Sequence, residues 1–176
     1  YPLDLDWVGR VRMNRSALER RASTIGARRT VKKEWQAAWL LKAITLMDLT
    51  TLNSDDTAGR VERLCAKARH PLAQDLIDGY DIADLKIVPA AVCVYHAFVP
   101  TAVKALEGSG IPVAAVSTAF PHGLAPLDTK LREIEESIAA GAKEIDIVIE
   151  RHMVLTGDWQ ALYDQIKAFR KACGEA

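Results

Sequence analysis

The sequence lacks the features that mark secreted, membrane and nucleic-acid-binding proteins. Its three cysteines, Cys65, Cys93 and Cys173, are widely spaced and form no CxxC pair, so neither a disulfide framework nor a zinc site is predicted. No apolar run approaches the roughly 20 residues that a membrane-spanning helix needs, and residues 1–10 lack the layout of a signal peptide. The 23 basic and 23 acidic residues balance, which gives no reason to expect nucleic acid or a membrane as partner. These absences favour a cytoplasmic protein with reduced thiols.

Helical patterning dominates the first quarter of the chain. Residues 14–41 are predicted to be helical, with Val31, Trp35 and Trp39 spaced by four on one face. Basic residues occupy much of the remaining surface, which is typical of a solvated face, and no aromatic alternation suits the stacking of bases. We assign residues 1–41 to an N-terminal helical extension and residues 42–176 to the main domain.

Beyond the extension, short apolar strands alternate with amphipathic helices. Strands are predicted at residues 44–49, 90–95, 112–118 and 144–149. Helices are predicted at residues 55–68, 99–106, 127–140 and 158–173, the first of them capped by Asp55 or Asp56. Nearly continuous apolar strands separated by helices are what a parallel sheet covered by helices requires. The long link at residues 70–89 is predicted to be a surface excursion with some helix.

Two parallel architectures fit this α/β pattern, an open doubly wound sheet and a (β/α)8 barrel. No GxGxxG or GxxxxGKS/T sequence follows a predicted strand, so the loops that cradle phosphates in nucleotide-binding sheets are absent. In a barrel, the C-terminal ends of the strands meet at one mouth, where active sites lie. Polar side chains at or near those ends either form such a site or merely cap helices and bind loop amides. They are Asp48, Thr50, Cys93, Tyr95, Ser117, Thr118 and Asp146.

Asp146 is the most informative of these polar residues. It lies in the stretch KEIDIVIE, among isoleucines and a valine that read as a buried strand. Burying an unpaired carboxylate costs several kcal/mol, so the strand predicts a partner for Asp146.

Five segments carry a resemblance to a known family. The stretches VKKEWQAAWLLKAITLMDLTTL, AAVCVY, AFPHG, GAKEIDIVI and LYDQIKAFRKACGEA resemble deoxyribose-phosphate aldolase, in the longer form that has an N-terminal helical extension. The resemblance implies a (β/α)8 TIM barrel, of which this chain covers the extension and about the first four βα units. It also implies a lyase of deoxyribonucleotide catabolism, which cleaves 2-deoxy-D-ribose 5-phosphate reversibly into glyceraldehyde 3-phosphate and acetaldehyde. The reaction uses a lysine Schiff base and neither a metal nor another cofactor.

The resemblance also suggests roles for individual residues. Asp146 matches the family's proton-relay aspartate, and Asp48 matches a first-strand aspartate near the lysine that tunes the pKa of the Schiff-base lysine. His96 departs from the pattern, since many relatives have proline there. The positions that match residues lining the substrate side of the mouth are Thr50, Leu52, Cys93 and Phe120.

The family's two active-site lysines have no counterpart in this sequence. They lie in KTSTGK-like and GFKPAGG-like segments, neither of which occurs here. Lys42 and Lys143 precede strands, at the wrong end of a barrel. We expect Lys130, Lys167 and Lys171 to lie on helix faces that meet water, so no substitute nucleophile is predicted.

The expected partners follow from this gap. They are a sugar phosphate substrate and the C-terminal half of the barrel, supplied by the same polypeptide or by a second chain. Self-association into a homo-oligomer stays open, and the 176-residue chain alone is expected to be inactive. Two alternatives remain: a non-catalytic half-barrel that serves as an assembly or interaction module, and another TIM-barrel lyase with Asp146 as general base.

Overall fold

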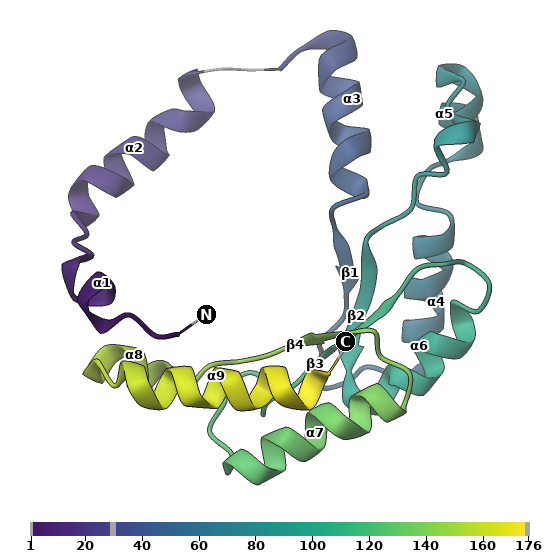
Figure 1. Cartoon of the computed structure of the whole chain (residues 1–176). Coiled ribbons are helices and arrows are strands. Elements are labelled where there is room, and N and C mark those ends of the chain that lie inside the picture. The colour runs from purple at the N-terminus through teal and green to yellow at the C-terminus, as the bar shows by residue number, and fades with distance from the viewer. Residues whose placement is uncertain (1, 29–30, 175–176) are drawn as a thin grey trace. The chain divides into compact units, whose positions relative to one another are not determined.

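A computed structural model describes residues 2–28 and 31–174 of the chain (Figure 1). The chain divides into two units, residues 1–41 and 42–176. The first unit holds the helices α1 (Leu5–Arg10) and α2 (Arg15–Arg28) and most of α3 (Lys33–Ile44). Among the described residues, no helix is both long enough and apolar enough to cross a membrane.

The helix predicted through residues 14–41 is interrupted, so this prediction is wrong in its middle. α2 ends at Arg28, and α3 begins at Lys33, whose φ of 55° is left-handed and cannot continue a right-handed helix. Val31 precedes α3 and does not share its helix with Trp35 and Trp39. The spacing of four residues from Val31 to Trp35 therefore does not lie within one helix. No proline or glycine between Val31 and Lys33 indicates this interruption in the sequence.

The second unit is built on a four-stranded parallel sheet. Its strands are β1 (Asp48–Thr50), β2 (Ala91–Tyr95), β3 (Val113–Val116) and β4 (Glu144–Asp146). The helices that follow the strands are α4 (Ala58–Arg69), α6 (Val99–Ala105), α7 (Leu127–Ala139) and α9 (Trp159–Cys173). A short helix α8 (Arg151–Thr156) precedes α9, and a single 3-10 turn η2 (His96–Phe98) precedes α6.

The strand order distinguishes the two predicted architectures. The strands lie side by side in the order β1-β2-β3-β4, and every neighbouring pair is parallel. A doubly wound sheet reverses its strand order at a switch point, whereas a barrel adds each new strand to the same side. The chain therefore has the α/β architecture of a partial barrel, and the predicted fold class is confirmed.

The two faces of the sheet differ in their neighbours. Val92 and Val94 of β2, with Val113 and Ala115 of β3, belong to the core cluster that α4 and α6 cover. The alternate side chains form a second, smaller cluster on the opposite face, made of Ala91, Cys93, Ala114 and Val116. We call this opposite face the inner face, because it is the one that would line the interior of a closed barrel.

Several element bounds differ from prediction. Ile44 ends α3, and β1 begins only at Asp48, because the three residues between them form a turn in which the Thr45 hydroxyl donates to the Lys42 carbonyl. α4 is capped by Thr57, whose hydroxyl accepts from the Arg60 amide, and not by either preceding aspartate. The last predicted helix has the additional helix α8 before it.

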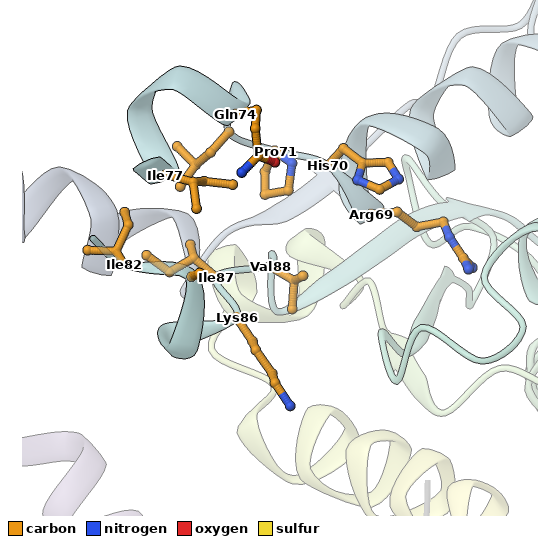
Figure 2. Close-up of a pocket in the computed structure, with 11 residues that line it drawn as sticks. Arg69, His70, Pro71, Gln74, Ile77, Ile82, Lys86, Ile87 and Val88 are labelled. Carbon is orange, nitrogen blue, oxygen red and sulfur yellow. The ribbon is translucent and has the colours of Figure 1, made fainter. Parts of the chain in front are cut away.

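The link between α4 and β2 contains α5 (Gln74–Tyr80) and a 3-10 turn η1 (Ala83–Leu85), as the predicted excursion with some helix. A cavity of about 280 Å³ lies under this link (Figure 2). Figure 2 shows Ile77 and Ile82 near each other, while the charged ends of Arg69 and Lys86 extend away from them. Arg69 donates to the carbonyls of residues 105 and 107, so its guanidinium anchors the end of α6.

Candidate active site

The strand register brings polar residues from three strands to the inner face. Thr50 of β1 is in register with Cys93 of β2, and Asp146 of β4 is in register with Val116 of β3. Because paired residues of neighbouring strands point to the same face, Asp48 lies on this face as well. Asp48, Thr50 and Asp146 are exposed, whereas Cys93 is buried.

Cys93 and Asp146 are in direct contact. The thiol Sγ donates a hydrogen bond to Asp146 Oδ2 at 3.4 Å. Burial, and then the negative charge of Asp146, raise the pKa of the Cys93 thiol to about 12. Cys93 is therefore a protonated hydrogen-bond donor to the carboxylate at neutral pH, and it is a poor nucleophile.

Glu144 adds a third carboxylate to the inner face and was not among the predicted site residues. It is in register with Ala114, two residues before Asp146. Glu144 is exposed, and partial desolvation, followed by the charges of Asp48 and Asp146, raises its pKa. Within residues 2–28 and 31–174, none of the three carboxylates forms an ion pair, so this face is an acidic surface that attracts a cationic group.

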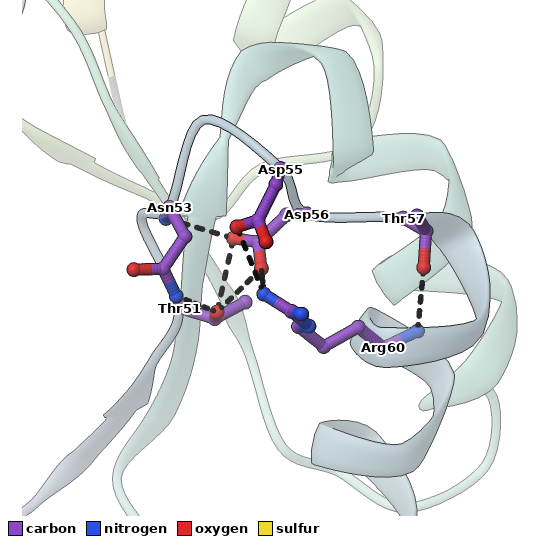
Figure 3. A network of polar contacts seen from close by, with 6 residues as sticks. All are labelled: Thr51, Asn53, Asp55, Asp56, Thr57 and Arg60. Carbon is purple, nitrogen blue, oxygen red and sulfur yellow. Dashed lines mark hydrogen bonds and ion pairs between the residues drawn. The ribbon is translucent and has the colours of Figure 1, made fainter.

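A hydrogen-bonded network fixes the loop that follows β1 (Figure 3). The Thr51 hydroxyl lies 2.9 Å from both carboxylate oxygens of Asp56, and the Asn53 amide donates to Asp56 Oδ2 at 3.0 Å. Arg60 of α4 pairs with Asp56 at 3.2 Å and with Asp55 at 3.1 Å. The Asp56 side chain is fully buried by these partners. The network holds Thr51 and Asn53, the residues on either side of Leu52. This segment directly follows Thr50.

Aromatic side chains stand at the C-terminal ends of β2 and β3. Tyr95 and Phe120 meet edge to face, with ring centroids 5.9 Å apart. Both rings, together with Leu52, pack against the inner-face cluster that contains Cys93. The structure thus brings Leu52, Phe120 and Cys93 together, with Asp146 at the thiol.

Comparison with known proteins identifies the family. Residues 42–176 match the model of the DeoC/LacD family of aldolases. The chain belongs to this family. It is 56% identical over 176 residues to deoxyribose-phosphate aldolase of Homo sapiens, a match that covers 99% of this chain and 55% of the human protein. The chain therefore spans about half the length of the curated relatives that it matches.

Solved structures share the fold of this aldolase family member. A Coccidioides immitis protein described as a candidate deoxyribose-phosphate aldolase superposes with a TM-score of 0.65 and 22% identity, over 93% of this chain and 59% of that one. A tetrameric deoxyribose phosphate aldolase from Aeropyrum pernix superposes with a TM-score of 0.55 and 22% identity, over 76% of this chain and 50% of that one.

The prediction that Lys130 lies on a helix face that meets water is wrong. Its side chain is completely buried at the N-terminal part of α7. Lys130 Nζ pairs with Glu150 Oε1 at 2.5 Å and donates to the carbonyl of Gly123 at 2.8 Å. The partner lies 20 residues further along the chain, so no helical pattern could have indicated it.

No lysine of the predicted set has the setting of a Schiff-base nucleophile. A nucleophilic lysine needs an amine that can reach the substrate, whereas the buried Lys130 Nζ is engaged by Glu150 and by the Gly123 carbonyl. The other lysines considered from the sequence are exposed: Lys42, Lys143, Lys167 and Lys171. In the part of the chain that the structure describes, no group of three His, Cys, Asp or Glu residues is arranged to hold a metal ion.

Proposed function

We propose that this chain is the first half of a deoxyribose-phosphate aldolase barrel, preceded by an N-terminal helical extension at residues 1–41. The reaction is the reversible cleavage of 2-deoxy-D-ribose 5-phosphate into glyceraldehyde 3-phosphate and acetaldehyde. The observation that carries the proposal is the contact of Asp146 with Cys93 on the acidic inner face, in a chain 56% identical to a curated aldolase of that name.

The chemistry explains why this face is acidic. In a Schiff-base aldolase, a lysine amine condenses with the substrate aldehyde and water leaves, after which the carbon–carbon bond breaks with its electron pair drawn into the protonated imine. Asp146 relays protons to and from the reacting carbon and oxygen atoms, and Asp48 lies close to the lysine that lowers the pKa of the nucleophile. The three carboxylates of the inner face favour a cationic lysine beside them, and we place both lysines on the remaining strands.

Four further residues are proposed to line the substrate side of the site. Leu52 and Phe120 supply apolar walls and Thr50 a hydroxyl, while Cys93 holds Asp146 in place through its thiol. The alternative of a non-catalytic half-barrel is not favoured, because the curated relatives that match 99% of this chain are aldolases.

The proposed partners complete the barrel. The missing strands come from the same polypeptide or from a second chain. The Aeropyrum pernix relative is a tetramer, which supports self-association of the complete protein. All three cysteines of the chain are free thiols, which supports the cytoplasm as its compartment.

The proposal is tested with a complete barrel. We would join residues 1–176 to the part of the human relative that follows the matched region, and measure retro-aldol cleavage of 2-deoxy-D-ribose 5-phosphate. We expect turnover and a borohydride-trapped adduct with acetaldehyde on the added part, and neither on the 176-residue chain alone. A trapped adduct on residues 1–176 would contradict the assignment of the nucleophile, and a folded, inactive barrel would contradict the proposed function.

A further inference from the structure

A buried ion pair lies between the segments that leave β3 and β4. Lys130 of α7 sits over the ring of Phe169 of α9, with Nζ 5.7 Å from the ring centroid. Its ammonium pairs with Glu150 and donates to Gly123. Gln165 of α9 donates to the same Glu150 oxygen at 2.7 Å. We call these five residues the Lys130 cluster.

The energetics show that stability alone does not account for this pair. Moving an ammonium and a carboxylate out of water costs several kcal/mol per ion, and apolar residues of similar volume often give equal or greater stability. The cluster also leaves Gln165 Oε1 buried without a partner. If these two positions contributed only to stability, methionine and leucine would serve equally well. What the ion pair adds is a fixed geometry between the groups that it joins.

That geometry joins the segments that follow two strands, which we call the β3 exit and the β4 exit. Gly123 has a φ of +72°, and a Cβ added there would lie 3.1 Å from the carbonyl oxygen of Ile149. Only glycine allows this close approach of the β3 exit to the β4 exit. Lys130 spans the same junction, since one hydrogen bond reaches Gly123 and the other reaches Glu150, the residue after Ile149.

A second link joins the same two exits nearer the sheet. The Thr118 hydroxyl accepts from the Val148 amide at 2.6 Å and lies 3.0 Å from the Val148 carbonyl. Thr118 and Ala119 have φ values of 59° and 62°, in the left-handed region. Such residues cost of order 1–3 kcal/mol each and persist where the surroundings over-determine them, often at functional sites.

Each exit carries a residue of the proposed active site. Phe120 lies between Thr118 and Gly123, and Asp146 lies two residues before Val148. The two links therefore bracket Phe120 and hold the strand end that carries Asp146.

We propose that Lys130 and Glu150 are positioning residues, whose ion pair fixes the exits of β3 and β4 against each other and thereby holds Asp146 and Phe120 in their reactive geometry. This inference rests on the proposed aldolase function. The pair touches no reacting atom, and it acts through the backbone of Gly123 and of the segment from Ile147 to Glu150.

The test uses the complete barrel described above. We expect Lys130→Met and Glu150→Gln each to lower kcat about tenfold or more per folded molecule, with KM changed less than threefold, because small displacements of catalytic groups cost that much. Lys167→Met is the matched control, since Lys167 is exposed on α9, and it should leave both constants unchanged.

A double variant separates positioning from stability. Lys130→Met combined with Glu150→Leu removes both charges and leaves an apolar contact, so it should unfold at a temperature no lower than either single variant. Its kcat should nevertheless stay as low as that of the single variants. Recovery of kcat in this variant would show that the pair serves folding only and would overturn the inference.

A second readout does not depend on activity. Peptide mass spectrometry of the same proteins measures how fast iodoacetamide alkylates Cys93, whose thiol contacts Asp146. We expect Lys130→Met to raise this rate several-fold over the parent and over Lys167→Met. An unchanged alkylation rate would overturn the inference. The alkylation measurement tests the positioning role even if the parent barrel shows no aldolase turnover. Absence of turnover would refute the proposed function separately.

Discussion

At the scale of single residues, the inner face carries three carboxylates, those of Asp48, Glu144 and Asp146, and none forms an ion pair within the described residues. The carboxylate of Asp146 accepts a hydrogen bond from the Cys93 thiol alone among the described residues, and a thiol is a weak donor. Partial desolvation and its acidic neighbours raise the pKa of Glu144. A cation near Glu144 would lower its pKa again, and the lysines that we propose for the completed barrel would supply one.

The first prediction concerns Asp146. In the complete barrel, Asp146→Asn should lower kcat by about 100-fold or more, because it removes proton transfer and retains side-chain volume. Circular dichroism and thermal unfolding should match the parent. Asp164→Asn, at an exposed position of α9, is the control. Parental kcat in the Asp146→Asn variant would remove Asp146 from the proton relay.

Sequence reasoning reached some of these residues and missed others for identifiable reasons. Asp48 and Asp146 could be found because each is a charge within or at the end of an apolar strand. Glu144 escaped notice because it reads as the polar start of a strand, and only the register with β3 shows that it faces inward. Lys130 was misread because its burial depends on Glu150, a long-range partner that helical periodicity does not reveal.

At the scale of elements, a network of ion pairs and hydrogen bonds around Asp56 holds the loop between β1 and α4. Burial by itself would raise the pKa of Asp56, but hydrogen bonds from Thr51, Asn53 and Arg60 outweigh it and hold the pKa below its usual value. Asp55 or Asp56 was predicted to cap α4, and both are wrong: Asp56 accepts hydrogen bonds from the loop that follows β1, while Thr57 caps the helix. Both are local hydrogen bonds available to aspartate and threonine, and the pattern alone does not choose between them.

A pH-dependent stability difference follows from the lowered pKa of Asp56. A carboxylate with a depressed folded-state pKa stabilises the fold above its unfolded-state pKa, and this contribution is lost as the pH falls through the folded-state value. The urea midpoint of Asp56→Asn should therefore lie below that of the parent at pH 7, with the gap shrinking at pH values below about 4. Asp55→Asn, whose side chain is 75% exposed, should shift the midpoint little at either pH. A gap that stays constant with pH would mean that the Asp56 charge has no part in holding the loop.

At the scale of the whole molecule, the four strands leave two edges within the described chain. β1 pairs only with β2, and β4 pairs only with β3. The alternation of apolar strands and helices was enough to predict this parallel sheet, because it is a repeated, local signal. What covers its edges cannot be read from such a signal, since a strand's pattern is the same whether its neighbour belongs to the same chain or to another one.

The final prediction concerns these edges. Each buried backbone group that loses its hydrogen bond costs about 1–3 kcal/mol, and several of them outweigh the modest stability of a small domain. A closed barrel has no such edges, so we expect the 176-residue chain alone to self-associate in light scattering and to exchange the amide protons of Thr50 and Ile145 rapidly, since these amides face away from β2 and β3. Mixing it with the remaining half of the human relative should give a one-to-one complex in which both amides become protected, because new strands pair with β1 and β4. A monomer whose Thr50 and Ile145 amides are already protected would show that the four-stranded unit needs no further strands, and the half-barrel proposal would then have to be abandoned.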